Sequence, residues 1–209
     1  MCSMQSFTDQ FLQYWALFSE ELQIPQNQSQ SLVSILTSAY SLNHYHTHQH
    51  IVECLELFYQ VKDRLNDPIA VELAIWFHDI VYDPQASDNE ERSAKLMQKY
   101  CVGIVDKNKL EKVAQWIIAT KKHQPTENLD LKYLLDIDLA ILASSPLRFA
   151  EYEQQIQQEY SWVEAELYKI KRAEVLTHFL RMEPLYQTEY FRKLLEQRAK
   201  LNLKLCKLN

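Results

Sequence analysis

The sequence is almost without glycine, because Gly103 is the only one among 209 residues. A soluble protein of this length has about fifteen glycines at the average usage of roughly 7%. Dinucleotide-binding and P-loop folds need glycine where the backbone approaches a phosphate, and β-rich folds need it in tight turns. The glycine count therefore argues against these architectures and favours a compact all-α protein.

Three other features are missing from the chain. The cysteines show no spacing typical of a metal finger; they are Cys2, Cys54, Cys101 and Cys206. No apolar run approaches the roughly 18 residues of a membrane span, and the N-terminus does not resemble a signal peptide. With 22 basic and 28 acidic residues, the net charge of −6 argues against a general nucleic-acid or membrane binder. We therefore expect a cytoplasmic protein with reduced thiols, and leave a homodimer open.

Apolar residues recur at spacings of three and four almost throughout, which predicts amphipathic helices that pack together. We expect about nine or ten helices in a single domain, 1–209, because no segment rich in proline, glycine or serine divides the chain. Capping-box spacing at Ser87 and Glu90, or at Asp88 and Glu91, predicts the start of one helix. We also expect all four tryptophans to lie at helix-packing positions, and His178 to be a hydrogen-bonded histidine on a core-facing helix.

The helix expected from Ile69 to about Ile80 is apolar nearly all round, which is typical of the centre of a core. It ends in His78 and Asp79. A carboxylate at the C-terminal end of a buried helix is disfavoured both by burial and by the helix dipole. A divalent cation is the strongest compensator, and the alternative is a hydrogen-bonded His–Asp pair.

Two more aspartates, Asp136 and Asp138, stand within the apolar stretch 131–142. Two carboxylates in such a stretch are difficult to explain as surface residues. One of them can serve as a helix cap, and we expect Asp136 to be that one.

Four of the seven histidines fall in one window, as His44, His46, His48 and His50. If a helix begins here, His46 and His50 lie one turn apart on the same face. Two such imidazoles could bind a metal, or one could bind while the other moves a proton. The alternative is a solvated polar loop that happens to be rich in histidine.

The order of these motifs resembles the HD-domain superfamily of metal-dependent phosphohydrolases. The segments YHTHQHI at 45–51, FHDIVYDP at 77–84 and NEERSA at 89–94 are similar to an uncharacterised family of HD hydrolases, as are 119–123 and 136–142. The first segment also resembles the catalytic domain of cyclic-nucleotide phosphodiesterases. Both families have asparagine where this chain has Thr47.

This resemblance implies an all-α bundle with a metal-binding core at about 30–145 and the helices of 146–209 packed on it. It implies one divalent ion, with manganese, iron, cobalt, nickel, zinc and magnesium all open. The implied metal ligands are His50, His78, Asp79 and Asp138.

The resemblance further implies that His46 donates a proton to the leaving group. Glu90 could orient a metal-bound water or a ligand imidazole, although a capping role explains it equally well. Lys122 and His123, beside Lys121, form a small basic cluster that could meet a phosphate, and we add Tyr45 to the expected substrate contacts. The lysines could instead complement a helix C-terminus.

The function implied is that of a metal-dependent phosphohydrolase that uses a metal-activated water on a small phosphorylated molecule, such as a nucleotide. Two alternatives remain at this point. A di-iron oxygenase of the same fold would need more histidines between Asp79 and Asp138 than His123 alone. A regulatory module would keep the fold and the metal without turnover.

Overall fold

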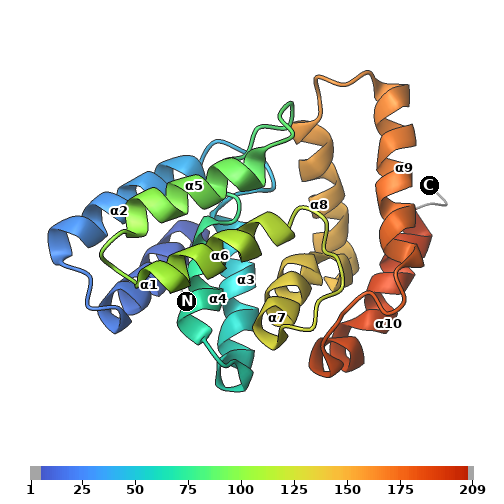
Figure 1. Ribbon diagram of the computed structural model, residues 1–209. Helices are drawn as coiled ribbons and strands as arrows, with labels where there is room; N and C mark the ends of the chain where they lie inside the picture. The colour runs from blue at the N-terminus through green and yellow to red at the C-terminus, as the bar shows by residue number, and fades with distance from the viewer. Residues whose placement is uncertain (1–5, 207–209) are drawn as a thin grey trace, which may run out of the picture. The chain divides into compact units, whose positions relative to one another are not determined.

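The structure is a computed structural model that describes residues 6–206 (Figure 1). Ten α-helices and two short 3₁₀ helices account for most of this part of the chain. It contains no β-strand, and a single bridge joins Val102 to Val105. The expected all-α fold is confirmed.

The chain divides into two compact units, one ending at Gln124 and the other beginning at Pro125. The helices of the N-terminal unit are α1 (Phe7–Glu21), α2 (Gln26–Ala39), α3 (His48–Val61), η1 (Lys62–Arg64), α4 (Pro68–Phe77), α5 (Asn89–Cys101) and α6 (Lys107–Ala119). Those of the C-terminal unit are α7 (Leu129–Asp138), η2 (Leu139–Ala143), α8 (Pro146–Glu159), α9 (Ala165–Arg181) and α10 (Glu189–Cys206).

Helix α4 lies at the centre of the N-terminal unit, where it contacts α3, α5 and α6 (Figure 1). Every residue from Ala70 to Phe77 is buried, as its apolar sequence predicts. Asp67 caps the first turn by accepting from the backbone of Ala70, and Pro68 needs no hydrogen-bond partner there. Asp67 also pairs with two lysines of α6, Lys109 at 2.6 Å and Lys112 at 2.5 Å. These contacts fix the start of the helix that carries His78 and Asp79 at its other end.

Trp76 of α4 packs against aromatic rings from α1. Trp76 lies at ring-centroid distances of 4.9 Å from Phe11, 5.2 Å from Trp15 and 6.4 Å from Phe18. Buried aromatic groups of this size contribute much of the stability of a small core.

In the C-terminal unit, a buried aspartate joins α7 to α10. The carboxylate of Asp136 accepts hydrogen bonds of 2.7 Å from the backbone of Gln187 and from both the backbone and the hydroxyl of Thr188. Burial raises the pKa of Asp136 to about 6, and the donors at Thr188 and Gln187 oppose the rise. The expected role of Asp136 as a helix cap is therefore wrong. Asp136 lies inside α7 and binds the residues that precede α10, whose first turn is capped by the Thr188 hydroxyl, which accepts from the Phe191 N–H at 3.3 Å.

The division of the chain differs from the expected one, in which the core ends near residue 145. Segment 129–144 belongs with the C-terminal helices, because α10 and the residues before it bind its backbone. The Tyr186 hydroxyl donates to the carbonyl of Leu139, and the Asn202 amide donates to that of Leu142. Sequence composition gives no sign of this boundary.

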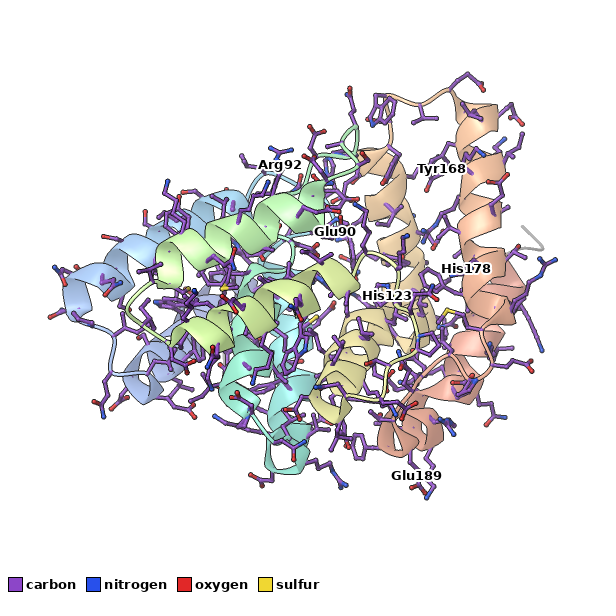
Figure 2. The ribbon with its side chains drawn as sticks, viewed as in Figure 1. Glu90, Arg92, His123, Tyr168, His178 and Glu189 are labelled. Carbon is purple, nitrogen blue, oxygen red and sulfur yellow. The ribbon has the colours of Figure 1, made fainter. Side chains whose placement is uncertain are left out.

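The expected start of a helix at Asp88 is confirmed, because α5 begins at Asn89 with Asp88 at the cap position, although the side chain of Asp88 makes no capping hydrogen bond. Two other local expectations are wrong. Trp162 is 53% exposed in the segment between α8 and α9. His178 is exposed on α9 and so does not face a core (Figure 2).

Within the described residues, Cys54, Cys101 and Cys206 are free thiols, and Cys2 lies outside them. No helix between residues 6 and 206 has the length and apolar character to cross a membrane.

The buried carboxylate of Glu72 on α4 makes the stability of the chain depend on pH. Glu72 is 0% exposed; Tyr59 donates to one of its oxygens at 3.2 Å, and Lys62 Nζ lies 3.9 Å from the other. Burial raises its pKa to about 7, above the value of an unfolded glutamate. The stabilising contribution of its proton is therefore complete below about pH 4 and lost as the pH rises through 7.

We expect the E72Q variant to lose less stability than the wild type between pH 5 and pH 8, by about 1–3 kcal/mol in the free energy of unfolding. Urea denaturation at both pH values measures the difference. The matched control is E111Q, which changes an exposed glutamate of α6 and should follow the wild type. Equal pH dependence in E72Q and E111Q would contradict the assignment.

Candidate metal centre

The side chains of the histidine-rich segment, at the start of α3, point in different directions. His48 turns toward α1 and α2, where its Nε2 lies 3.1 Å from the carbonyl of Thr37 and its ring 4.6 Å from that of Phe11. Burial lowers the pKa of His48, which favours the neutral ring. His46 and His50 instead face Asp79, while His44 is exposed.

The hydrogen bond of His78 decides which ring nitrogen faces the centre. His78 ends α4, and its Nδ1 lies 3.0 Å from the carbonyl of Ile75. A carbonyl oxygen only accepts, so Nδ1 must carry the proton. In the neutral ring, Nε2 is then an unprotonated nitrogen with its lone pair directed into the centre.

Three donor atoms of the N-terminal unit converge at this point. His50 Nε2 lies 3.2 Å from His78 Nε2, and Asp79 Oδ2 lies 3.5 Å from the first nitrogen and 3.0 Å from the second. Both imidazoles are buried, and the Asp79 side chain is only 16% exposed. Lone pairs this close repel one another unless a cation, either a proton or a metal ion, lies among them.

The spacing and chemistry of this donor set fit a metal ion. Bonds of about 2.1 Å place neighbouring ligand atoms about 3.0 Å apart at right angles and about 3.4 Å apart in a tetrahedron. The distances of 3.0, 3.2 and 3.5 Å fall on these values. Imidazole nitrogen with carboxylate oxygen is a set that transition metals accept. His50, His78 and Asp79 can therefore hold a metal ion.

The charge of Asp79 is compensated by its neighbours. Burial disfavours the carboxylate, but the imidazoles of His78, His46 and His50 outweigh it and keep the pKa of Asp79 below its ordinary value. Burial, together with the Asp79 charge, raises the pKa of Tyr40 well above 10. The protonated Tyr40 hydroxyl donates to the carbonyl of Trp76 and so supports the last turn of α4.

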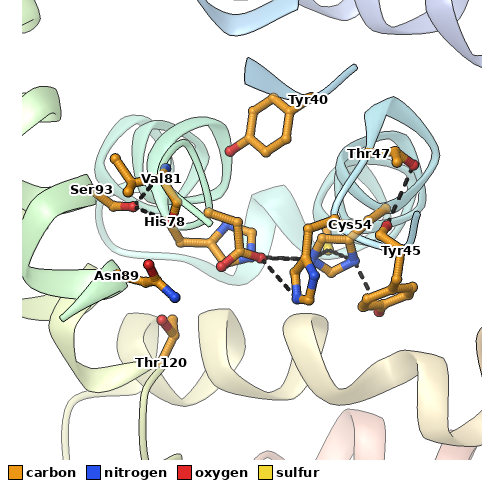
Figure 3. A network of polar contacts seen from close by, with 12 residues as sticks. Tyr40, Tyr45, Thr47, Cys54, His78, Val81, Asn89, Ser93 and Thr120 are labelled. Carbon is orange, nitrogen blue, oxygen red and sulfur yellow. Dashed lines mark hydrogen bonds and ion pairs between the residues drawn. The ribbon is translucent and has the colours of Figure 1, made fainter. Parts of the chain in front are cut away.

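Two side chains lie behind His50. The Tyr45 hydroxyl is 3.1 Å from His50 Nδ1, and Cys54 Sγ is 3.8 Å from the same nitrogen (Figure 3). Tyr45 is only 5% exposed. Its hydroxyl contact suits a residue that orients a metal ligand, and contact of Tyr45 with a substrate stays a prediction. Sequence reasoning assigns no role to Tyr40 or Cys54, because neither spacing nor residue type identifies residues that support a metal ligand.

The basic cluster after α6 is used partly within the protein. Lys121 Nζ donates to the carbonyl of Ser87 and to the carboxylate of Glu91, and lies 3.5 Å from Glu90. These contacts tie the end of α6 to the start of α5, near the labelled Glu90 and Arg92 (Figure 2). Glu90 thus has an ion-pair partner, and its expected role beside the metal stays a prediction.

Lys122 and His123 follow directly. Lys122 is exposed, and His123 is half-buried with a backbone φ of 49°. This left-handed conformation is uncommon for a residue with a side chain and marks a tight turn after α6. Contact of either residue with a phosphate stays a prediction.

Asp138 is the last residue of α7 and lies in the C-terminal unit. Its neighbours Ile137 and Leu139 are buried, whereas Asp138 itself is partly exposed. Asp138 thus differs from Asp136, because both oxygens of Asp136 accept hydrogen bonds from Gln187 and Thr188, just before α10.

No protein-family model matches the chain, and neither a curated protein nor a solved structure matches it. The candidate centre is therefore defined by the geometry of this chain alone.

Proposed function

We propose that the chain is a metal-dependent phosphohydrolase of the HD type that acts on a small phosphorylated molecule. The observation that carries this proposal is the convergence of His50 Nε2, His78 Nε2 and Asp79 Oδ2 within 3.5 Å of one another. A site with few protein ligands leaves coordination positions open for substrate.

The proposal includes Asp138 as a fourth ligand. Its support is the resemblance of the motif order to HD hydrolases and its position as a carboxylate among buried neighbours. Two imidazoles with two carboxylates suit manganese, iron, cobalt, nickel or zinc, with metal availability deciding among them.

In this reaction the residues of the chain bind, orient and donate a proton. A bound divalent ion would polarise a phosphoryl oxygen and lower the pKa of a water molecule. His46 Nε2 lies 3.9 Å from Asp79 Oδ2, and the side chain is 13% exposed. It can therefore hold a proton beside the centre and pass it to the departing oxygen of the substrate. Tyr45, through His50 Nδ1, keeps Nε2 of that ligand directed inward.

The first prediction concerns metal binding. Mn²⁺ or Zn²⁺ should raise the melting temperature of the wild type, because an ion that binds only the folded chain stabilises it by about 2.7 kcal/mol at a hundred times its Kd. The H78A variant should lose this shift and its metal content in elemental analysis. The control is H178A, which removes an exposed histidine. Equal metal content in H78A and the wild type would contradict the centre.

The two aspartates of α7 provide a matched pair for the same assay. D138N should bind metal more weakly, by about tenfold or more, without a large loss of stability in the metal-free chain. D136N should be less stable but keep its metal affinity, because it weakens the hydrogen bonds that hold Gln187 and Thr188 before α10. The opposite pattern would remove Asp138 from the ligand set.

The second prediction concerns the reaction. The metal-loaded chain should release phosphate from at least one member of a panel of nucleotides, sugar phosphates and other small phosphate esters. D79N should abolish this release. Two irons per chain with oxygen uptake would instead favour the oxygenase. A metal-loaded chain that is inactive on the whole panel would favour the regulatory module.

The third prediction concerns His46. An alkyl phosphate needs a proton on its leaving oxygen, whereas p-nitrophenyl phosphate does not. H46A should therefore lose about 10²–10⁴-fold in kcat on the alkyl ester, with a much smaller loss on the nitrophenyl ester. Its metal content should be that of the wild type, and H44A serves as a control from the same segment. Unchanged turnover in metal-replete H46A would remove His46 from the mechanism.

A further inference from the structure

The imidazole of His46 is held between two tyrosine rings. The ring of Tyr82 is stacked on it, with centroids 3.5 Å apart and planes inclined by 22°. Tyr45 meets it edge-on, with centroids 4.9 Å apart and planes inclined by 78°. An imidazole in face contact with one ring and edge contact with another cannot rotate without moving one of them.

His46 has less backbone support than the metal ligand His50. It lies in the turn before α3, where the backbone of Thr47 donates to the carbonyl of Tyr45 at 2.8 Å. His50, in contrast, lies inside α3 and is buried. The orientation of His46 toward Asp79 therefore depends on side chains around it.

Tyr82 is itself fixed on both sides of its backbone. The hydroxyl of Ser93 accepts from the Val81 N–H at 3.1 Å and donates to the Val81 carbonyl at 3.3 Å. The amide of Asn89 accepts from the Asp83 N–H at 3.1 Å and donates to the Asp83 carbonyl at 2.9 Å. Figure 3 shows Ser93 beside Val81, with Asn89 close by. The two flanking residues of Tyr82 are thus each held by a reciprocal pair of hydrogen bonds from α5.

We propose that Tyr82 is a positioning residue, which fixes the imidazole of His46 beside Asp79 through this stack. The inference rests on the proposed function, in which His46 donates the proton. Because the contact is made by the face of the ring, phenylalanine at position 82 should preserve the orientation of His46, whereas leucine should not.

The first experiment observes the stack without any turnover. In a ¹H–¹³C spectrum of the histidine rings, the signal absent from H46A identifies His46. The face of Tyr82 should shift this signal upfield in the wild type, Y82F should keep the shift, and Y82L should lose most of it. The control Y14L breaks another tyrosine stack of the same unit, with Tyr59, and should leave the signal unmoved.

The second experiment separates positioning from a general structural role. Y82L should lose kcat on an alkyl phosphate far more than on p-nitrophenyl phosphate, as H46A does, with little change in KM or metal content. Y82F should restore the wild-type ratio between the two esters. A matched loss on both esters in Y82L, or the same loss in Y82F, would overturn the proposal.

N89A provides a second variant if Y82L does not fold, because it removes only hydrogen bonds near the surface. It should move the His46 signal in the direction expected for Y82L, by a smaller amount. An unmoved signal in the variant that folds would overturn the proposal. If the wild type hydrolyses neither ester, the proposed function fails, and the spectrum alone decides whether Tyr82 orients His46.

Discussion

The arrangement of the N-terminal unit depends on how one carboxylate is compensated at the C-terminal end of a buried helix. Asp79 follows α4, where burial and the helix dipole both oppose a negative charge. The imidazoles of His50 and His78 face it, and the bond of His78 to Ile75 leaves Nε2 unprotonated in the neutral ring. Only a cation among these atoms, either a proton or a metal ion, makes the Asp79 charge tolerable, and α3 and α4 thus assemble a cation site. The site needs no glycine-lined loop, which agrees with a chain that has one glycine.

Helix α4 contributes side chains to the hydrophobic core and also positions His78 and Asp79 at the candidate centre. Changes in core packing can therefore alter the geometry of the centre. The side chain of Trp76 lies among the aromatic rings of α1, and the carbonyl of the same residue accepts from Tyr40. Asp67 fixes the other end of α4 through two lysines of α6. A displacement of α4 would therefore move His78 and Asp79 relative to His50, where changes of a few tenths of an ångström matter for ligation. Stability and metal affinity are expected to vary together for substitutions around α4.

Much of this arrangement follows from the sequence, and the failures have physical causes. Helical periodicity predicts the α-helices. The apolar run that ends in His78 and Asp79 predicts a carboxylate with compensating neighbours, and the structure places the imidazoles of His50 and His78 beside it. The hydrogen bonds that Asp136 accepts could not be predicted, because its partner Thr188 is 52 residues away. Nor could the stack of Tyr82, since no periodicity states where a loop side chain points.

The proposed division of labour between His50 and His46 has a structural basis. A metal ligand must hold its nitrogen within a few tenths of an ångström, and the buried first turn of α3 provides this for His50. A proton donor must instead reach an oxygen whose position changes as its bond breaks. His46, in the turn before α3, gains its orientation from Tyr82 and Tyr45, rings that can yield slightly without disturbing helical hydrogen bonds. In this proposal the helical backbone positions the metal ligand His50, and side-chain packing positions the proton donor His46, four residues earlier in the same segment.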